Sequence, residues 1–191
     1  MGHIERRIRE KERIRKRIIE SALNIATKKG WEAVTIRKIA DAIEYTPPIV
    51  YEHFKNKEDL FNELVLLGHR RLTDSAILAI GNETDSRKIL MIFSMKFWDF
   101  AFENKELYQL MFSLNSKIPD KEVISLIQKF HAIFTELVGD EKIAPEAMFS
   151  YMCLQQGYIY NVKQMGLPPG FEGKDPKKLF KKAISKYIRD I

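Results

Sequence analysis

The stretch TIRKIADAIEYTPPIVYEHFKNKEDLF, residues 35–61, contains the local signals that decide the fold of this chain. Apolar side chains recur at helical spacing from 36 to 43, which predicts a short helix with Thr35 as its N-cap. Residues 44–46 form a turn, and a second short helix is predicted to begin at Pro47. Two short helices joined by three residues predict a helix-turn-helix module.

Prolines and capping residues indicate where the next helices begin. Prolines in the first turn of a helix lose no hydrogen bond, because the N–H groups there have no partner within the helix. With Thr46 as N-cap, its hydroxyl can cap only the N–H of Ile49, since the two intervening prolines have none. This second helix is expected to end near Phe54. The run from Asn56 to Asp59 has the pattern of a capping box, which predicts a long helix toward Leu72.

A long, strongly charged helix precedes the module. It is predicted from Ile4 to Lys29, with Gly30 in the position of a left-handed cap. Between Glu5 and Arg17 it carries eight basic residues and three acidic ones. Such a charge run is by default a solvated helix face, and the alternative is an arm that follows the phosphate backbone or enters the minor groove of DNA.

Helical spacing continues through the remainder of the chain, so we predict an all-α protein. The later helices are expected at Ser86–Glu103, Glu106–Leu114, Pro119–Val138, Pro145–Met165 and from Pro176 to Ile188. A chain of 191 residues is long enough for one large domain or two small ones. We expect a three-helix helix-turn-helix domain over residues 1–70, with the module at about 35–54, and a helical bundle over residues 71–191.

The charge of the chain is positive and uneven. The net charge is +6, with +4 over residues 1–70, −3 over 71–173 and +5 over 174–191. Basic ends on a slightly acidic body favour contact with an anion such as nucleic acid. The single cysteine, Cys153, excludes an internal disulfide and a cysteine-rich zinc site, and we expect it in the core.

The sequence also argues against several other classes of protein. It holds no P-loop, no dinucleotide-binding, hydrolase or metalloprotease motif, and no apolar segment as long as a bilayer span. We therefore expect a soluble, cytoplasmic protein that is not an enzyme and has no metal site and no membrane contact.

Several motifs stand in order within residues 12–70. They are Thr35-Ile36-Arg37-Lys38-Ile39-Ala40, then Val50-Tyr51-Glu52-His53-Phe54, then Lys55-Asn56-Lys57-Glu58-Asp59-Leu60-Phe61. In this order and spacing the sequence resembles the tetracycline-repressor-like (TetR) family of bacterial and archaeal transcriptional regulators. The resemblance implies a homodimer, most often a repressor, that a small-molecule effector releases from double-stranded DNA. A twofold dimer reads a pseudo-palindrome whose half-sites lie about 34–36 Å apart, or a multiple of that distance.

Residues at positions that match the family are expected to contact DNA. The family position of Tyr51 touches a phosphate, as does that of Lys57, and the position of Arg37 contacts a phosphate or a base. The full set of candidates is Arg37, Tyr45, Thr46, Pro47, Pro48, Ile49, Tyr51, His53, Lys55 and Lys57. The sequence departs from the family at Glu44, where glycine is usual, so we expect a positive φ or a changed turn there. Residues 47–49 can contact thymine methyl groups but cannot make the bidentate hydrogen bonds that read purines.

The resemblance further implies effector binding and dimerisation within residues 71–191. The pocket candidates are aromatic and polar residues of the expected helices: Phe97, Trp98, Tyr108, Met111, Phe112, Phe134, Gln155, Gln156 and Tyr158. For any one of them, plain core packing is the competing interpretation. The stretch from Phe100 to Phe112 resembles a C-terminal subclass named for a Trp-His-Gly signature, of which only Gly157 is present. The last two helices are expected to pair with their copies in a dimer.

Two other classes of protein stay open at this point. A helical module that binds protein without binding DNA is mildly favoured by the apolar run Pro47-Pro48-Ile49. An enzyme on an α-helical bundle would need a nucleophile–base pair or a metal cluster, and the sequence offers neither. No cofactor is expected beyond the unidentified effector.

Overall fold

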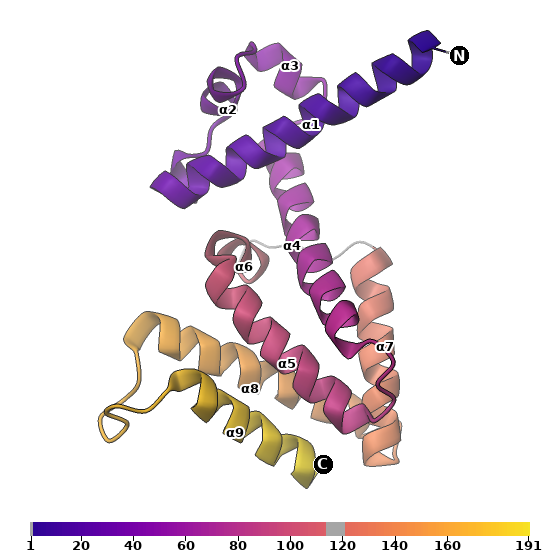
Figure 1. Cartoon of the computed structure of the whole chain (residues 1–191), viewed down its shortest axis with the longest axis vertical. Helices are drawn as coiled ribbons and strands as arrows, with labels where there is room; N and C mark the ends of the chain where they lie inside the picture. Colours follow the sequence, from indigo (N-terminus) through magenta and orange to yellow (C-terminus); the bar gives the residue numbers. More distant parts are fainter. Residues whose placement is uncertain (1, 114–120) are drawn as a thin grey trace. The chain divides into compact units, whose positions relative to one another are not determined.

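The computed structural model describes residues 2–113 and 121–191, which consist of helices and connecting turns (Figure 1). The helices are α1 (Gly2–Lys29), α2 (Ile36–Ala42), α3 (Pro47–Tyr51), α4 (Lys57–Ile80), α5 (Ser86–Glu103), α6 (Lys105–Met111), α7 (Lys121–Val138), α8 (Ala144–Met165) and α9 (Pro176–Asp190). A 3₁₀ turn, Trp31–Ala33, follows α1. The all-α prediction is confirmed. Each helix in these two ranges is too short or too polar to cross a lipid bilayer.

Local signals place most helix ends where the sequence predicts them. The hydroxyl of Thr35 accepts a hydrogen bond from the N–H of Lys38 at 3.3 Å and caps α2. Gly30 takes a φ of 77° directly after α1, a backbone angle that a side chain would disfavour. The carboxylate of Asp175 accepts from the N–H groups of the first turn of α9. Each of these interactions lies within a few residues along the chain, which is why the sequence reveals it.

Two boundaries were predicted wrongly. α3 ends at Tyr51 rather than near Phe54, because the N–H groups of residues 53 and 54 both return to the carbonyl of Val50 and close the helix. α4 continues past Leu72 to Ile80, where the buried Ala76 extends its packed face. The predicted ends Leu114 and Pro119 lie outside the described residues.

The described residues divide into two compact units. The first comprises residues 2–68 and 106–113, and the second comprises 69–105 and 121–191. The sequence places the division at residue 70 and assigns everything after it to the second domain. The structure differs, because the segment 106–113 belongs with the first unit.

Two contacts within the first unit explain where α6 lies. The indole N–H of Trp31 donates to the carbonyl of Glu106 at 3.0 Å. At Gly68, near the middle of α4, an added Cβ would overlap the sulfur of Met111, so α4 and α6 approach closely there. Both contacts join residues far apart in sequence, and neither can be anticipated from helical spacing.

The core of the first unit is formed by one face from each of its first four helices. Its fully buried apolar side chains are Ile18, Ala22, Val34, Ile39, Ala40, Val50, Leu60 and Leu64, with Phe54 1% exposed. Trp31 packs edge-on against Phe61, with ring centroids 5.3 Å apart. This core fixes α2 and α3 on a platform of α1 and the start of α4.

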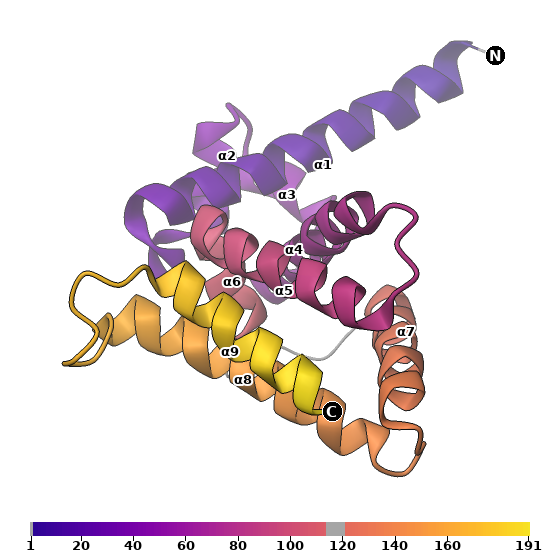
Figure 2. The same ribbon diagram turned by 60° about the horizontal axis from the view of Figure 1, so that its bottom comes forward.

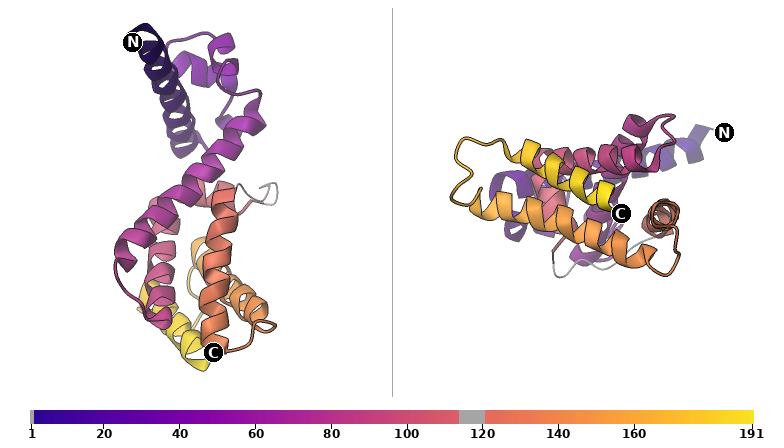
Figure 3. Two further views of the ribbon diagram at one scale, coloured as in Figure 1. Left: turned by 90° about the vertical axis from the view of Figure 1, so that its right-hand side faces the viewer. Right: turned by 90° about the horizontal axis from the view of Figure 1, so that it is seen from below.

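In the second unit, α8 and α9 run side by side in opposite directions, α9 also packs on α5, and α7 packs on α8 (Figures 2 and 3). The apolar stripe of α9 consists of Phe180, Ile184 and Ile188 and is buried inside this unit. The first two side chains are fully buried, and the third is 3% exposed. Trp98 of α5 lies 4.9 Å from Phe180, centroid to centroid. Burial of these side chains is the main stabilising contribution to the unit.

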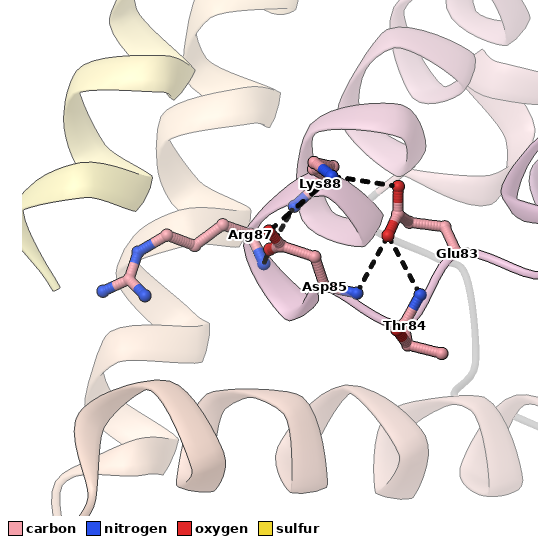
Figure 4. Close-up of polar contacts among 5 residues, drawn as sticks. All are labelled: Glu83, Thr84, Asp85, Arg87 and Lys88. Carbon is pink, nitrogen blue, oxygen red and sulfur yellow. Dashed lines mark hydrogen bonds and ion pairs between the residues drawn. The ribbon is translucent and has the colours of Figure 1, made fainter.

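The start of α5 is a dense local cap (Figure 4). Asp85 Oδ1 accepts from the N–H groups of Arg87 and Lys88, and Glu83 Oε1 accepts from those of Thr84 and Asp85. Hydrogen bonds from the backbone N–H groups lower the pKa of Glu83, and the nearby Lys88 ammonium adds to this effect. Asp85 is the N-cap residue, and its carboxylate pairs two N–H groups that would otherwise have no partner within the helix.

Candidate nucleic-acid interface

The turn between α2 and α3 depends on one strained residue. Glu44 has a φ of 63°, as expected from its place in the turn. The N–H of Glu44 donates to the carbonyl of Asp41 at 3.2 Å, and the N–H of Tyr45 donates to that of Ala40 at 3.0 Å. This pair of bonds is a Schellman motif, which usually uses glycine at the left-handed position. Glu44 therefore holds the turn geometry at some cost in backbone strain.

The first turn of α3 differs in one detail from the predicted cap. Thr46 is the N-cap residue and the prolines occupy the first helical positions, as predicted. The Thr46 hydroxyl makes no capping bond, and the N–H of Ile49 donates to the backbone carbonyl of Thr46 at 3.0 Å instead. A tight backbone turn already satisfies this N–H, so the hydroxyl of Thr46 stays exposed and available.

α3 presents most of its side chains to the outside of the first unit. Val50 is fully buried and anchors the helix, while Tyr51 is 54% exposed. Pro48 is exposed, and Pro47 and Ile49 are half-buried. A five-residue helix with one buried side chain depends on its neighbours for its position.

Two arginines of α1 supply that support. Arg15 donates to the carbonyl of His53 at 3.0 Å and to the carboxylate of Glu63 at 2.7 Å, and its guanidinium lies 4.3 Å from the ring centre of Phe54. Arg17 donates to the carbonyl of Ile43 at 2.7 Å. α1 is thus tied to the end of α2 and to the residues after α3. Sequence reasoning missed these roles, because nothing in a basic run distinguishes an arginine that ties elements together from a solvated one.

The start of α4 carries two further candidates. Asp59 donates its N–H to the side-chain oxygen of Asn56 at 2.8 Å, and its carboxylate accepts from the N–H of Lys55 at 3.0 Å. The predicted capping residues are confirmed. In the usual capping box the carboxylate would bind the N–H of the N-cap residue, Asn56, but here it binds the N–H of the preceding residue, Lys55. Lys55 is exposed, and the ammonium of Lys57 lies over the ring of Phe61 at 4.9 Å. Both positive charges therefore stand at a helix N-terminus that already favours anions.

His53 sits at the far end of α3 in a positive surrounding. Burial lowers the pKa of His53, the charges of Lys11 and Arg15 lower it further, and Glu52 opposes them. The imidazole is therefore mainly neutral near neutral pH, and a phosphate placed beside it would favour its protonated form.

All ten candidate DNA-contacting residues lie in the first unit. Nine of them fall on the continuous segment from Tyr45 to Lys57, which the capped turn, α3 and the start of α4 hold together. Arg37 is exposed in the first turn of α2 and shares no hydrogen bond or ion pair with the other nine. Positive charge, exposed hydroxyl groups and an exposed short helix on one segment suit contact with phosphates and a groove.

The nine pocket candidates do not all lie in one unit. Three of them, Tyr108, Met111 and Phe112, lie on α6 or directly after it in the first unit, and burial raises the pKa of Tyr108 to about 12. The remaining six lie in the second unit: Phe97, Trp98, Phe134, Gln155, Gln156 and Tyr158. Phe97, Trp98, Phe134 and Gln155 are buried, and Gln156 and Tyr158 are not fully buried.

A buried polar cluster lies among the second group. Tyr151 Oη donates to the carbonyl of Leu90 at 2.7 Å and lies 2.6 Å from the hydroxyl of Ser94. Gln155, 2% exposed, lies one turn along α8, and its Oε1 has no hydrogen-bond partner in the structure. Burial raises the pKa of Tyr151, which keeps its hydroxyl protonated. The sequence pointed to Gln155 but not to Tyr151 and Ser94, which look like ordinary helix residues.

Cys153 corrects another expectation. It is exposed, although the apolar sequence around it favours the core. The buried positions of α8 follow a four-residue step through Ala147, Tyr151, Gln155 and Ile159, and Cys153 falls between them on the outer side.

The first unit has the architecture of a helix-turn-helix domain in which α1 and α4 support α2 and α3. Residues 18–64, which cover this module, match the model of the family described as bacterial regulatory proteins, tetR family. Over these residues the chain is similar to that family.

Two relatives and one solved structure are similar to longer stretches of the chain. An uncharacterized HTH-type transcriptional regulator of Bacillus subtilis, YdgC, is 32% identical over 106 residues, which cover 53% of this chain and 54% of YdgC. The HTH-type transcriptional activator FasR of Mycolicibacterium smegmatis is 25% identical over 126 residues, or 66% of this chain and 57% of FasR. The chain spans just over half the length of these two relatives. A solved TetR variant of Acinetobacter baumannii in complex with minocycline has the same fold, with a TM-score of 0.69 at 18% identity, covering 91% of this chain and 93% of that one.

Proposed function

We propose that this protein is a transcriptional regulator that binds duplex DNA through α3, as a homodimer whose DNA affinity depends on a small-molecule effector. One observation carries the proposal. Arg15 and Arg17 of α1 bind the main-chain carbonyls of His53 and Ile43, on either side of a short exposed helix, and Lys55 and Lys57 follow that helix. A rigid helix beside positive charge is what insertion into a major groove requires.

The expected mode of reading is limited direct contact with bases. Pro48 and Ile49 have only apolar side chains, which suit the methyl group of thymine. Thr46, Tyr45 and Arg37 carry the hydrogen-bonding groups of the surface, and Tyr51 and Lys57 are assigned to phosphates. Affinity is then mainly electrostatic and depends strongly on salt concentration.

The dimer proposal is supported by the outer face of α8. Phe149 is 67% exposed, Met152 40% and Tyr160 61%, and no charged residue occurs from residue 147 to residue 162. A Cβ added at Gly157, in the middle of this face, would meet nothing within the chain. Glycine inside a helix costs about 1 kcal/mol relative to alanine, and close approach of a second α8 would explain it. Since α9 buries its own stripe, we assign most of the apolar contact of the last two helices to α8.

The effector proposal is supported by the second unit. Gln155 Oε1 is buried without a hydrogen-bond partner in the structure, one helical turn from the buried Tyr151. A buried amide oxygen left unpaired costs about 1–3 kcal/mol, which a hydrogen-bond donor on an effector would offset. The Acinetobacter protein that shares the fold is in complex with minocycline, which supports a small organic effector as the class of ligand.

The sign of regulation comes from the family resemblance, which favours a repressor. The relative FasR is described as an activator, so a direct test is needed. A reporter gene downstream of the selected DNA site should be expressed less when the protein is present and more again when its effector is added. Higher expression with the protein would make it an activator and leave DNA binding intact.

The first experiment is selection of the purified protein against a random duplex pool at about physiological salt, where non-specific phosphate binding is weak. We expect a twofold-symmetric motif to be enriched. Tyr51→Ala and Lys57→Ala should each weaken binding to that motif, and Lys57→Ala, which removes a positive charge, should also reduce its dependence on salt. If wild-type protein enriches no motif, with or without metabolite extract, the proposal is wrong and a protein-binding role for α3 is favoured. The similarity of residues 18–64 to a family of regulatory proteins favours either function over the enzyme alternative.

A further inference from the structure

Residues 4–13 of α1 bury no side chain against the rest of the first unit. The side chains from Ile4 to Arg13 are exposed, and the first buried residue of the helix is Ile18. Figure 1 shows these turns continuing past α2 and α3 toward the N-terminus. A helix segment of this length has little stability of its own in water. Packing within the unit therefore does not account for the N-terminal turns, residues 4–13.

Three cations form a row along one side of this helix. Arg7, Lys11 and Arg15 follow at four-residue steps, which places them above one another on a helical face. Arg15 is fastened to the carbonyl of His53, just after α3. The side chains of Arg7 and Lys11 make no ion pair or hydrogen bond with the residues that the structure describes, whereas Arg13 on the other side is paired with Glu10 at 2.7 Å.

The row has a length that suits a nucleic-acid backbone. With a rise of about 1.5 Å per residue, Lys11 and Arg7 lie about 6 and about 12 Å beyond Arg15 along the helix. One strand of B-DNA advances about 3.4 Å per nucleotide along its axis, so the row covers about three to four nucleotides. We propose that Arg7 and Lys11 bind the phosphate backbone of the duplex that α3 reads, extending the contact beyond the His53 end of α3. This inference rests on the proposed DNA-binding function.

Charge and area favour DNA over a protein partner for these turns. From Ile4 to Arg17 the helix carries eight basic and three acidic residues. Its only large exposed apolar side chains among the described residues there are Ile4 and Ile8, at 75% and 54% exposure. Two isoleucines fall far short of the roughly 800 Å² per partner that a stable protein interface buries.

The test uses the full chain and the duplex enriched by selection, with flanking base pairs on both sides. The variant Arg7→Gln/Lys11→Gln is compared with Lys28→Gln/Lys29→Gln, which removes the same charge from exposed positions at the other end of α1. Affinity is measured as a function of salt. The slope of the logarithm of the binding constant against the logarithm of salt concentration should become shallower by about 0.9 for each phosphate that the protein no longer neutralises. For a dimer in which four phosphates are affected, the total change is up to about 3.6. The hydroxyl-radical footprint of the Arg7→Gln/Lys11→Gln variant on the duplex should also become shorter at both outer edges.

Failure of this inference can be distinguished from failure of the proposed function. A reduced slope only in the Arg7/Lys11 variant supports the inference. An unchanged slope in that variant, while Lys57→Ala lowers it, overturns the inference and leaves DNA binding by α3 intact. An equal reduction in the Lys28/Lys29 variant also overturns it, because the effect is then one of total charge. If the wild-type protein binds no duplex, both fail together.

Discussion

Replacing Arg15 with methionine should loosen α3 from its support. Methionine keeps most of the length of the side chain but removes the hydrogen bond to the carbonyl of His53, the ion pair with Glu63 and the contact over the ring of Phe54. A hydrogen bond from a charged donor contributes about 1.5–3 kcal/mol, and an exposed cation–π contact about 0.5–1. The ion pair adds only a little, because the Arg15 side chain is 39% exposed and therefore screened by solvent.

From these contributions we expect the free energy of opening around α3 to fall by about 2 kcal/mol, at the low end of the sum because the methionine stem still packs. Native-state hydrogen exchange measures this free energy of local opening directly. The amide of Phe54, which donates to the carbonyl of Val50, should exchange about 30-fold faster. A local assay is preferable to global unfolding, since two compact units need not unfold together.

The matched control is Arg13→Met on the same helix. Arg13 is exposed and its ion pair is with Glu10 of the same helix, so its loss should change the exchange of Phe54 by less than about twofold. If Arg13→Met and Arg15→Met have equal effects, the role assigned to Arg15 is wrong. Only the general charge of α1 would then matter.

Three further predictions follow from the backbone, the dimer face and the titration of one histidine. Glu44→Gly should raise the free energy of unfolding of the first unit by about 0.5–1 kcal/mol, because a residue at φ 63° is strained, whereas Glu44→Ala should not; thermal melts of both variants decide. Phe149→Asp should convert the proposed dimer to a monomer, measured by analytical ultracentrifugation. Leu78→Asp, at a more exposed apolar residue of α4, is the control and should leave the dimer intact. If both variants dissociate, general destabilisation is the cause. DNA affinity should rise as the pH falls from about 8 to about 6, because the pKa of His53 is lowered in the free protein and a nearby phosphate would raise it, so binding takes up a proton. Titration calorimetry with His53→Gln checks this, and an unchanged pH dependence in the variant would remove His53 from the interface.

Helix starts, caps and turn residues could be predicted closely, since each is a contact between residues a few positions apart. Thr35 and Asn56 cap the helices as expected, and Asp175 caps α9 by the same kind of local contact. Glu44 adopts a positive φ, which was one of the two outcomes expected from its place in the turn. The errors lie where a local signal competes with another group. The N–H of Ile49 binds the carbonyl of Thr46 instead of its hydroxyl. α3 ends earlier than predicted because two later N–H groups both bind the carbonyl of Val50.

The candidate interface was predicted as a set of residues on one segment, and the structure keeps that segment continuous and largely exposed. What supports it was not predicted. The ties from Arg15 and Arg17 to main-chain carbonyls join residues 38 and 26 positions apart. A carbonyl has no sequence signature, so a charged run reveals that cations are present but not which of them are already engaged.

The sequence alone determined the helical class, the order of the elements, the turn between the two short helices and the residues that follow it, because periodicity and capping act over one or two turns of chain. Tertiary structure decided which helix faces are buried and which stay exposed. It placed α6 with the first unit, buried the stripe of α9, turned Cys153 outward and left the faces of α8 and the first turns of α1 open. Burial is a property of all the neighbours at once, and those neighbours are distant in sequence.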